Sequence, residues 1–292
     1  MESIPSISAY IPCYNNAKTL EVAISGIQRQ SIKVDDLFVV DDGSKDASRE
    51  IASALQVRVI EMKVNQGRGA VRARAMEEAR HDFVLCCDAT NRLQGDFLQL
   101  ALPWFADAKV AGVCGRLMDL DISGALGRWR ARHLFRQDEL LSSRRDNLST
   151  WGTLMRKSAV MNTGNFNRKL RFGEDFELGK RLMAAGYETH FDPKLVVATQ
   201  IRNNLAQTME RFFRWHAIES RGLTLHDFIR AQVLAIRVLA PKDLKNRDPL
   251  AAVISLLTPY YKIRHYYHLK KIPSETNPDF SPGKAGSVDE TG

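Results

Sequence analysis

The chain has 292 residues, 44% hydrophobic and 26% charged, and a formal net charge of +8. This length can bury a substantial core, as one large domain or as one domain with an appendage. Residues 1–8 hold neither a basic start nor an apolar stretch, so no secretory signal peptide is expected. The four cysteines form no CxxC pair, which favours buried, reduced thiols over disulfides or a metal site.

The positive charge is concentrated in the C-terminal third of the chain. Residues 201–272 contain thirteen Lys and Arg against five Asp and Glu, whereas residues 273–292 contain one Lys against four acids. A basic region predicts an anionic partner, and anionic lipid or a diphosphate satisfies it as well as nucleic acid does. The chain contains no recognised nucleic-acid-binding module, so we expect no nucleic-acid partner.

Short apolar segments alternate with helical patterns through the first 115 residues. Strands are expected at residues 7–12, 37–41, 57–62, 83–88 and 110–115. Helices are expected between them at residues 17–30, 47–55 and 69–80. Near-continuous apolar strands separated by helices indicate a parallel sheet covered on both faces. The predicted fold class is therefore α/β.

Beyond residue 115 the pattern changes to mixed elements. A basic helical segment is expected at residues 126–142, a strand at 151–155, a short helix and turn at 156–164, and a helix at 174–185. Arg-rich helical patterns follow at 207–239. The apolar stretch at 250–257, which we expect Pro259 to interrupt, falls short of the about 20 apolar residues that span a bilayer.

A first acidic pair, Asp41 and Asp42, follows the predicted strand at 37–41. In open α/β sheets ligands bind at the carboxyl ends of the strands. Two adjacent carboxylates there can accept hydrogen bonds from a ribose hydroxyl or a base N–H. Asp-Gly-Ser is also a common turn composition, and taken alone this pair favours a turn.

A second acidic pair, Glu174 and Asp175, opens the predicted helix at 174–185. Carboxylates at a helix start satisfy free N–H groups and the helix dipole. A carboxylate there can equally serve as a general base that takes a proton from an attacking hydroxyl. The Gly67-Arg68-Gly69 segment imitates a dinucleotide-binding fingerprint, but it follows the third strand and ends on Arg72, so we reject a nicotinamide cofactor.

Five motifs follow one another in chain order: Tyr10–Asn15, Val40–Asp46, Asn65–Gly67 with Ala73-Arg74, Asp88, and Gly173–Asp175. This ordered set resembles the family 2 glycosyltransferases of GT-A fold over about residues 5–215. The resemblance implies a Rossmann-like, mostly parallel sheet with helices on both faces and a helical C-terminal extension. It also implies an inverting enzyme that faces the cytoplasm and transfers a sugar from a nucleotide-diphosphate donor to an acceptor hydroxyl on a glycan or a lipid-linked acceptor.

The resemblance also implies roles for individual residues. Asp175 would be the general base, and Glu174 would orient the acceptor or its neighbour. The donor would be bound by six residues: Pro12, Tyr14, Asp41, Asp42, Arg74 and Asp88. Of these, Pro12, Tyr14 and Asp42 would frame the base and ribose. Arg74 would lie near the base or diphosphate, and Asp88 beside the donor sugar and the metal.

The chain departs from the family pattern at two metal positions. Thr90 stands where a metal-binding Asp is usual, and Gln200 stands where some relatives have a His. Neutral oxygens are weaker ligands for Mg²⁺ or Mn²⁺ than carboxylates. Either Asp88 and the diphosphate hold the ion alone, or basic side chains replace it. A catalytically inactive, nucleotide-sugar-binding relative is the alternative function.

Gln207 with Arg214 and Trp215 resembles the Q-x-x-R-W element of processive polysaccharide synthases at a longer spacing, so we interpret the chain as a non-processive relative. Arg211 or Arg214 would meet the diphosphate, and a basic helix face packed through Trp215 is the alternative.

The expected organisation is a glycosyltransferase domain at 1–215, with a donor half at about 1–115 and an acceptor half at about 116–215. A basic helical extension at 216–272 and a disordered tail at 273–292 would follow. Leu250–Ile272 combines apolar residues, four tyrosines and a basic run, the composition of an interfacial anchor on the inner face of the plasma membrane. A helix docked on the core with a solvated basic face is the alternative.

Overall fold

The computed structural model describes residues 4–216 and 225–269. The chain divides into two compact units, Met1–Ile122 with Phe135–Arg202, and Ser123–Leu134 with Asn203–Gly292. This division differs from the expected boundaries, because residues 123–134 and 203–215 belong with the C-terminal helices and not with the sheet.

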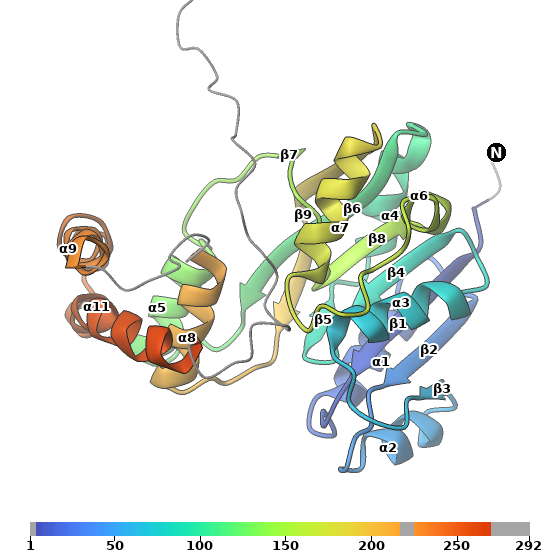
Figure 1. The fold of residues 1–292 in the computed structure, drawn as a ribbon, viewed down its shortest axis with the longest axis horizontal. Coiled ribbons are helices and arrows are strands. Elements are labelled where there is room, and N and C mark those ends of the chain that lie inside the picture. The colour runs from blue at the N-terminus through green and yellow to red at the C-terminus, as the bar shows by residue number, and fades with distance from the viewer. Residues whose placement is uncertain (1–3, 217–224, 270–292) are drawn as a thin grey trace, which may run out of the picture. The chain divides into compact units, whose positions relative to one another are not determined.

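Within the described residues the first unit is built on a nine-stranded sheet (Figure 1). Its strands are β1 (Ile7–Cys13), β2 (Asp36–Asp41), β3 (Arg58–Glu61), β4 (Phe83–Cys87), β5 (Asn91–Leu93), β6 (Val110–Asp119), β7 (Arg144–Arg145), β8 (Gly152–Arg156) and β9 (Glu188–Thr199). The sheet order is β3-β2-β1-β4-β8-β6-β9-β5, with β7 paired to β9. Strands β1 to β4 are parallel, whereas β8 is antiparallel to both β4 and β6. The predicted α/β class is confirmed.

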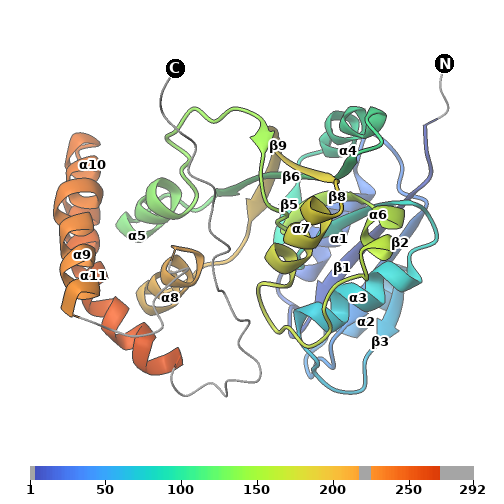
Figure 2. The ribbon, with the colours of Figure 1, turned by 45° about the horizontal axis from the view of Figure 1, so that its top comes forward.

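Helices cover both faces of this sheet (Figures 1 and 2). They are α1 (Leu20–Gln28), α2 (Ser48–Ala54), α3 (Arg68–Glu78), α4 (Phe97–Ala101), the 3-10 helix η1 (Leu102–Ala106), α6 (Lys157–Asn162) and α7 (Glu174–Ala184). Helices α1 and α2 contact each other, and α3, α6 and α7 form a second group of mutual contacts. Right-handed crossovers from β1 to β2 and β3 put α1 and α2 on one face, and the return from β3 to β4 puts α3 on the other.

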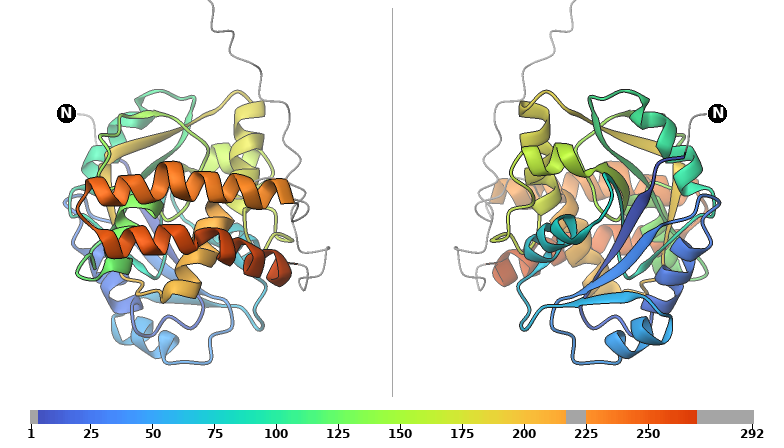
Figure 3. Two further views of the ribbon diagram at one scale, coloured as in Figure 1. Left: turned by 90° about the vertical axis from the view of Figure 1, so that its left-hand side faces the viewer. Right: turned by 90° about the vertical axis from the view of Figure 1, so that its right-hand side faces the viewer.

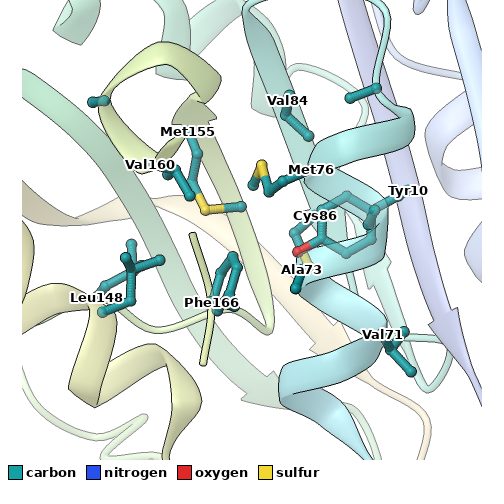
Figure 4. Close-up of a cluster of buried hydrophobic side chains, with 14 of the residues drawn as sticks. Tyr10, Val71, Ala73, Met76, Val84, Cys86, Leu148, Met155, Val160 and Phe166 are labelled. Atoms are coloured by element: carbon teal, nitrogen blue, oxygen red, sulfur yellow. The ribbon is translucent and has the colours of Figure 1, made fainter. Parts of the chain in front are cut away.

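The core under α3, α6 and α7 joins elements that are far apart in sequence. Figure 4 shows Met76 of α3 beside Cys86 of β4, Met155 of β8 and Val160 of α6, all of them fully buried. A Cβ on Gly69 would collide with the carbonyl oxygen of Asn167, so only glycine allows α3 to approach the loop before α7 this closely. This packing brings the start of α7 toward the strands that begin the chain.

The second unit is entirely helical within the described residues. Its elements are α5 (Ala125–Trp129), the π-helical turn η2 (Arg130–Leu134), α8 (Leu205–His216), α9 (Leu225–Leu234), the π-helical turn η3 (Ala235–Leu239), α10 (Ala240–Lys245) and α11 (Pro249–Leu269). The continuous stretch α9–η3–α10 and α11 lie side by side (Figure 3, left), and we call them the helical hairpin. The helix expected at 126–142 ends at Leu134. No described helix is long and apolar enough to cross a membrane.

Pro259 does not interrupt α11, contrary to expectation. A proline inside a helix removes the N–H that would donate to the carbonyl four residues earlier. Here that carbonyl belongs to Ser255, and it accepts a hydrogen bond from Oγ1 of Thr258 at 2.8 Å. The neighbouring threonine therefore supplies the missing donor, a detail that proline alone does not reveal. The tail expected to be disordered, 273–292, lies outside the described residues.

Candidate functional site

The loops after β1 and β2 are joined at the carboxyl edge of the sheet. The N–H of Asn15 donates to Oγ of Ser44 at 2.9 Å, and the N–H of Lys45 donates to Oδ1 of Asn15 at 2.8 Å. Pro12 is the last but one residue of β1, next to this junction, and the Tyr14 side chain is exposed. The structure therefore brings the first predicted motif against the second.

Asp41 and Asp42 are both buried, and each has a different task in the loop. Asp41 accepts the N–H of Ser44, as the turn interpretation expects. Asp42 accepts the N–H groups of Gln66 and Gly67 at 2.7 and 2.9 Å, so it holds the loop before α3. Burial raises the pKa of Asp42, although these two hydrogen bonds oppose the shift. A carboxylate retains further lone pairs, so Asp42 can still accept a ligand hydroxyl.

Arg72 of α3 bridges the two halves of the candidate site. Its side chain is 3% exposed, and its Nη2 donates to Oδ1 of Asp88 at 2.9 Å, just after β4. Its Nε donates to Oε1 of Glu174 at 2.9 Å, at the start of α7. A buried guanidinium requires such partners because its charge is costly to remove from water. One residue thereby connects the two regions that the sequence assigns to donor and acceptor.

The sequence predicts Arg74 near the donor and gives Arg72 no role, whereas the structure places Arg72 between Asp88 and Glu174. On α3, Arg72 shares its side of the helix with Met76 at the i, i+4 spacing of a buried face. That pattern is the signal that could have identified it. Arg74 is half-exposed and pairs with Glu78 on the same helix at 2.6 Å. The structure does not bring Arg74 to the cluster around Asp88.

Glu174 and Asp175 begin α7 after Gly173, whose φ of 72° is a left-handed conformation that glycine adopts readily. Glu174 is buried, and its Oε2 has no hydrogen-bond partner among the described residues. Burial raises the pKa of Glu174, an effect that the Arg72 guanidinium partly offsets. A second, unsatisfied oxygen therefore remains on a carboxyl group that Arg72 holds in one orientation.

Asp175 is partly exposed, and both of its oxygens accept hydrogen bonds. Oδ2 accepts from the N–H and from Oγ1 of Thr150 at 3.3 and 3.1 Å. Oδ1 accepts from the N–H of Phe176 at 2.9 Å, one of the free N–H groups of the first helical turn. The second contact corresponds to the helix-start interpretation. The first orients the carboxylate through a residue 25 positions away, which a helix cap does not require.

The two positions that depart from the family's metal pattern lie next to each other. The N–H of Gln200 donates to the carbonyl of Thr90 at 2.8 Å, and Nε2 of Gln200 is buried without a partner among the described residues. No group of three His, Cys, Asp or Glu side chains in the described residues could hold a metal ion. Asp88 remains the candidate carboxylate, and Mg²⁺ is commonly held by one or two carboxylates together with substrate phosphates.

Arg211 and Arg214 belong to α8 of the second unit. The Arg211 guanidinium lies over the ring of Trp215, with 4.9 Å between Cζ and the ring centroid. This is the contact that the basic-helix interpretation expects. The side chain of Arg214 lies outside the described part of the chain. A diphosphate role for either residue stays a prediction.

Solved structures share this fold. The structure of S. aureus TarS 1–349 in complex with UDP matches 91% of this chain and 92% of its own, with a TM-score of 0.56 and 16% identity. The mannosyltransferase PcManGT from Pyrobaculum calidifontis, in complex with GDP-Man and Mn²⁺, matches 93% of this chain and 78% of its own, with a TM-score of 0.55 and 15% identity. At such identities the likeness concerns the fold, and it supports the expected GT-A type.

Curated relatives are enzymes of polysaccharide synthesis. The poly-beta-1,6-N-acetyl-D-glucosamine synthase of Staphylococcus aureus (strain COL) is 21% identical over 239 residues, which cover 78% of this chain and 58% of the relative. The synthase of Staphylococcus epidermidis is 21% identical over 271 residues, covering 88% and 65%. The chain thus spans less than two thirds of the length of these relatives. The profile of the family named "Glycosyl transferase family 2" matches residues 8–164, more than half of the sequence. The chain belongs to glycosyl transferase family 2, and the family resemblance expected from its motifs is confirmed.

Proposed function

We propose that this enzyme transfers a sugar from a nucleotide-diphosphate donor to an acceptor hydroxyl with inversion at the anomeric carbon. The observation that carries the proposal is the Arg72 bridge between Asp88 and Glu174. The bridge joins the carboxyl edge of β4, where ligands of open α/β sheets bind, to a helix that begins with two carboxylates. A donor and a general base can therefore share one site.

The donor would occupy the joined loops after β1 and β2. Pro12 and Tyr14 would contact the base, and Asp42 would accept a hydrogen bond from the base or ribose, with Asp41 shaping the turn beneath it. Asp88 would lie beside the sugar. A divalent ion, Mg²⁺ or Mn²⁺, would be held by Asp88 and the donor's diphosphate, where it would neutralise charge on the leaving group.

The chemistry is a direct displacement. The acceptor oxygen forms a bond to the anomeric carbon while the bond from that carbon to the diphosphate oxygen breaks, and the nucleoside diphosphate leaves with the electron pair. Asp175 accepts the proton of the acceptor hydroxyl, because a carboxylate within hydrogen-bond reach can take it as the new bond forms. Thr150 would hold Asp175 in position for this step. Glu174, fixed by Arg72, would orient the acceptor.

The acceptor would be a glycan or a lipid-linked sugar, and the reaction would take place in the cytoplasm on the inner face of the plasma membrane. The polymer synthases among the curated relatives support a role in glycoconjugate or polysaccharide biosynthesis. Arg211 and Arg214 remain candidates for the diphosphate.

A nucleotide-sugar-binding protein without turnover is the second candidate. Thr90 and Gln200 favour it, because they stand in place of a metal-binding Asp and His and are weaker metal ligands. The two candidates differ in one measurable respect, since a binding protein would hold the donor intact.

A thermal-shift panel of UDP-, GDP- and dTDP-sugars, with and without Mn²⁺, would identify the donor. A ligand at about 100 times its dissociation constant stabilises a protein by roughly 2.7 kcal/mol. The stabilising donor would then be incubated with the protein, and release of the nucleoside diphosphate would be followed with and without candidate acceptors. Release shows an enzyme, and stabilisation without release would leave only the binding function. If no donor stabilises the protein, the proposal is wrong.

A further inference from the structure

The helical hairpin exposes large apolar side chains along both of its helices. On α9 and η3 they recur at nearly every turn, at Leu225, Ile229, Val233 and Ile236. On α11 they recur at the spacing of a single helix side, at Leu250, Val253, Leu257 and Tyr260. Their exposed fractions lie between 40% and 75%. Large apolar side chains that recur along one side of each helix mark a candidate binding face, since scattered single residues would be ordinary.

The buried positions of the same hairpin are mostly small or polar. They include Ala235, Ala240, Ala251, Ala252, Ser255 and Thr258, with Leu239 and Pro259 as larger exceptions. Water-soluble helices have the opposite arrangement, with large apolar residues inside. Small residues between helices and large aliphatic residues outside are the arrangement of helices that contact lipid.

Two acidic residues of the hairpin, Asp243 and Asp248, are buried and paired with basic side chains. Asp248 accepts two hydrogen bonds from Arg128 at 2.7 and 2.9 Å. Asp243 contacts Arg132 and His133, and it accepts a hydrogen bond from Oγ of Ser255 at 2.6 Å. Both carboxylates are buried within the second unit, and the third acid of the described hairpin, on α9, is half-buried.

Among the side chains of the hairpin that the structure describes, the exposed charges are all positive. Between residues 225 and 261, the charged side chains that are exposed are Arg230, Arg237, Lys245 and Arg247. A face that combines apolar side chains with basic residues and keeps its acids off the exposed surface is complementary to an anionic surface. A second copy of this chain would bring the same basic residues against one another, which like-charge repulsion disfavours.

We propose that the helical hairpin is a membrane-binding element that lies on an anionic lipid surface. Its apolar side chains would enter the boundary between headgroups and acyl chains, and its four exposed basic residues would contact anionic headgroups. Because neither helix is long and apolar enough to cross the bilayer, the hairpin would lie along it. This inference extends the anchor expected at 250–272 to the helix before it, and it does not depend on the proposed transferase chemistry.

The test is flotation of the full chain with vesicles of phosphatidylcholine alone or mixed with phosphatidylglycerol. We expect at least about tenfold stronger binding to the mixed vesicles, weakened by added salt. Ile229→Glu and Val253→Glu should each reduce binding by about tenfold or more, because each places a charge on the apolar face. Leu140→Glu, at a fully exposed apolar position of the first unit, is the matched control and should bind like the unmodified protein. Circular dichroism checks that each variant is folded.

The contribution of the basic residues to vesicle binding is tested with a second set of variants and a matched control. Arg230→Gln with Arg237→Gln should lower binding to mixed vesicles and leave weak binding to neutral vesicles unchanged. The control pair, Arg29→Gln with Lys33→Gln in the first unit, should leave binding to both kinds of vesicle unchanged. Folded hairpin variants that bind like the unmodified protein would overturn the proposal, and so would an unmodified protein that does not float. Sedimentation velocity tests whether the face instead binds a second copy of the chain. If the lipid-free protein is a stable dimer, and Ile229→Glu and Val253→Glu each dissociate it, the face is a dimer interface and the proposal is overturned.

Discussion

Nε of Arg72 donates a hydrogen bond at 2.9 Å to Oε1 of Glu174, a residue 102 positions later in the chain. Both side chains are almost completely buried. The pair connects a helix that follows the third strand of the sheet to the helix that carries the proposed general base. Through Arg72, the start of α7 is therefore fixed relative to α3 and to Asp88 after β4.

Replacement of Arg72 tests this connection. Arg72→Met would leave Glu174 buried without its cation, and removal of one partner from a buried ion pair typically costs about 3–5 kcal/mol. Arg74→Met, two positions along the same helix, removes only a surface pair with Glu78 and should cost less than about 1 kcal/mol. Chemical denaturation of both variants measures the difference. Equal losses of stability would show that the buried bridge is not the stabilising contact.

Asp175→Asn tests the general base. Asparagine keeps the shape and can still hydrogen-bond Thr150, but it cannot accept a proton. Loss of general-base catalysis typically costs about 10²–10⁴-fold in rate, while donor affinity should hardly change. Asp42→Asn should show the opposite pattern, with weaker donor binding first. Transfer rate is measured beside the melting temperature. Asparagine is also a good residue at a helix start, so a stable and fully active Asp175→Asn protein would support the capping interpretation and exclude the catalytic one.

Thr90→Asp tests the metal site. Because Thr90 and Gln200 provide only neutral groups, we expect donor binding to depend on Mn²⁺ less steeply than in relatives with two metal-binding carboxylates. The carboxylate that this substitution introduces should increase metal affinity. Titration calorimetry of the donor with Mn²⁺ or with EDTA measures both effects. If EDTA abolishes donor binding to the unmodified protein, the idea of a weakened metal site is wrong.

Asp248→Asn tests the second unit and its dependence on pH. Hydrogen bonds from Arg128 lower the pKa of Asp248 to about 2. A carboxyl group whose pKa is lower in the folded state stabilises the fold at pH values above its ordinary pKa, which is about 3.9 for Asp. This stabilisation is lost as the pH falls toward 2. The free energy of unfolding of the variant should therefore be lower than that of the unmodified protein by about 2 kcal/mol at pH 7. At pH 3 the difference should be about half as large. A difference that does not shrink on acidification would contradict this account.

The strands of the first unit and their polar ends could be predicted from the sequence. β1, β2 and β4 are buried on both faces and therefore appear as short apolar runs, and Asp42 and Asp88 follow two of them directly. The short strands β5 and β7 carry no such signal, because two or three residues are too few to show a period. Residues 123–134 join the second unit through ion pairs with distant aspartates, a choice of partner that no local pattern shows.

The sequence by itself determined the α/β class, the order of the motifs and the start of α7, because apolar periodicity and residues at element ends are local properties. Only the tertiary structure revealed that Arg72, and not Arg74, pairs with Asp88 and Glu174, because the two arginines lie two positions apart on one helix and point to different sides of it. It likewise revealed that Thr150 orients Asp175 and that Thr258 satisfies the carbonyl freed by Pro259. A local pattern shows which side of an element is buried. The partner that a buried charge or a free carbonyl meets there depends on how the whole chain folds.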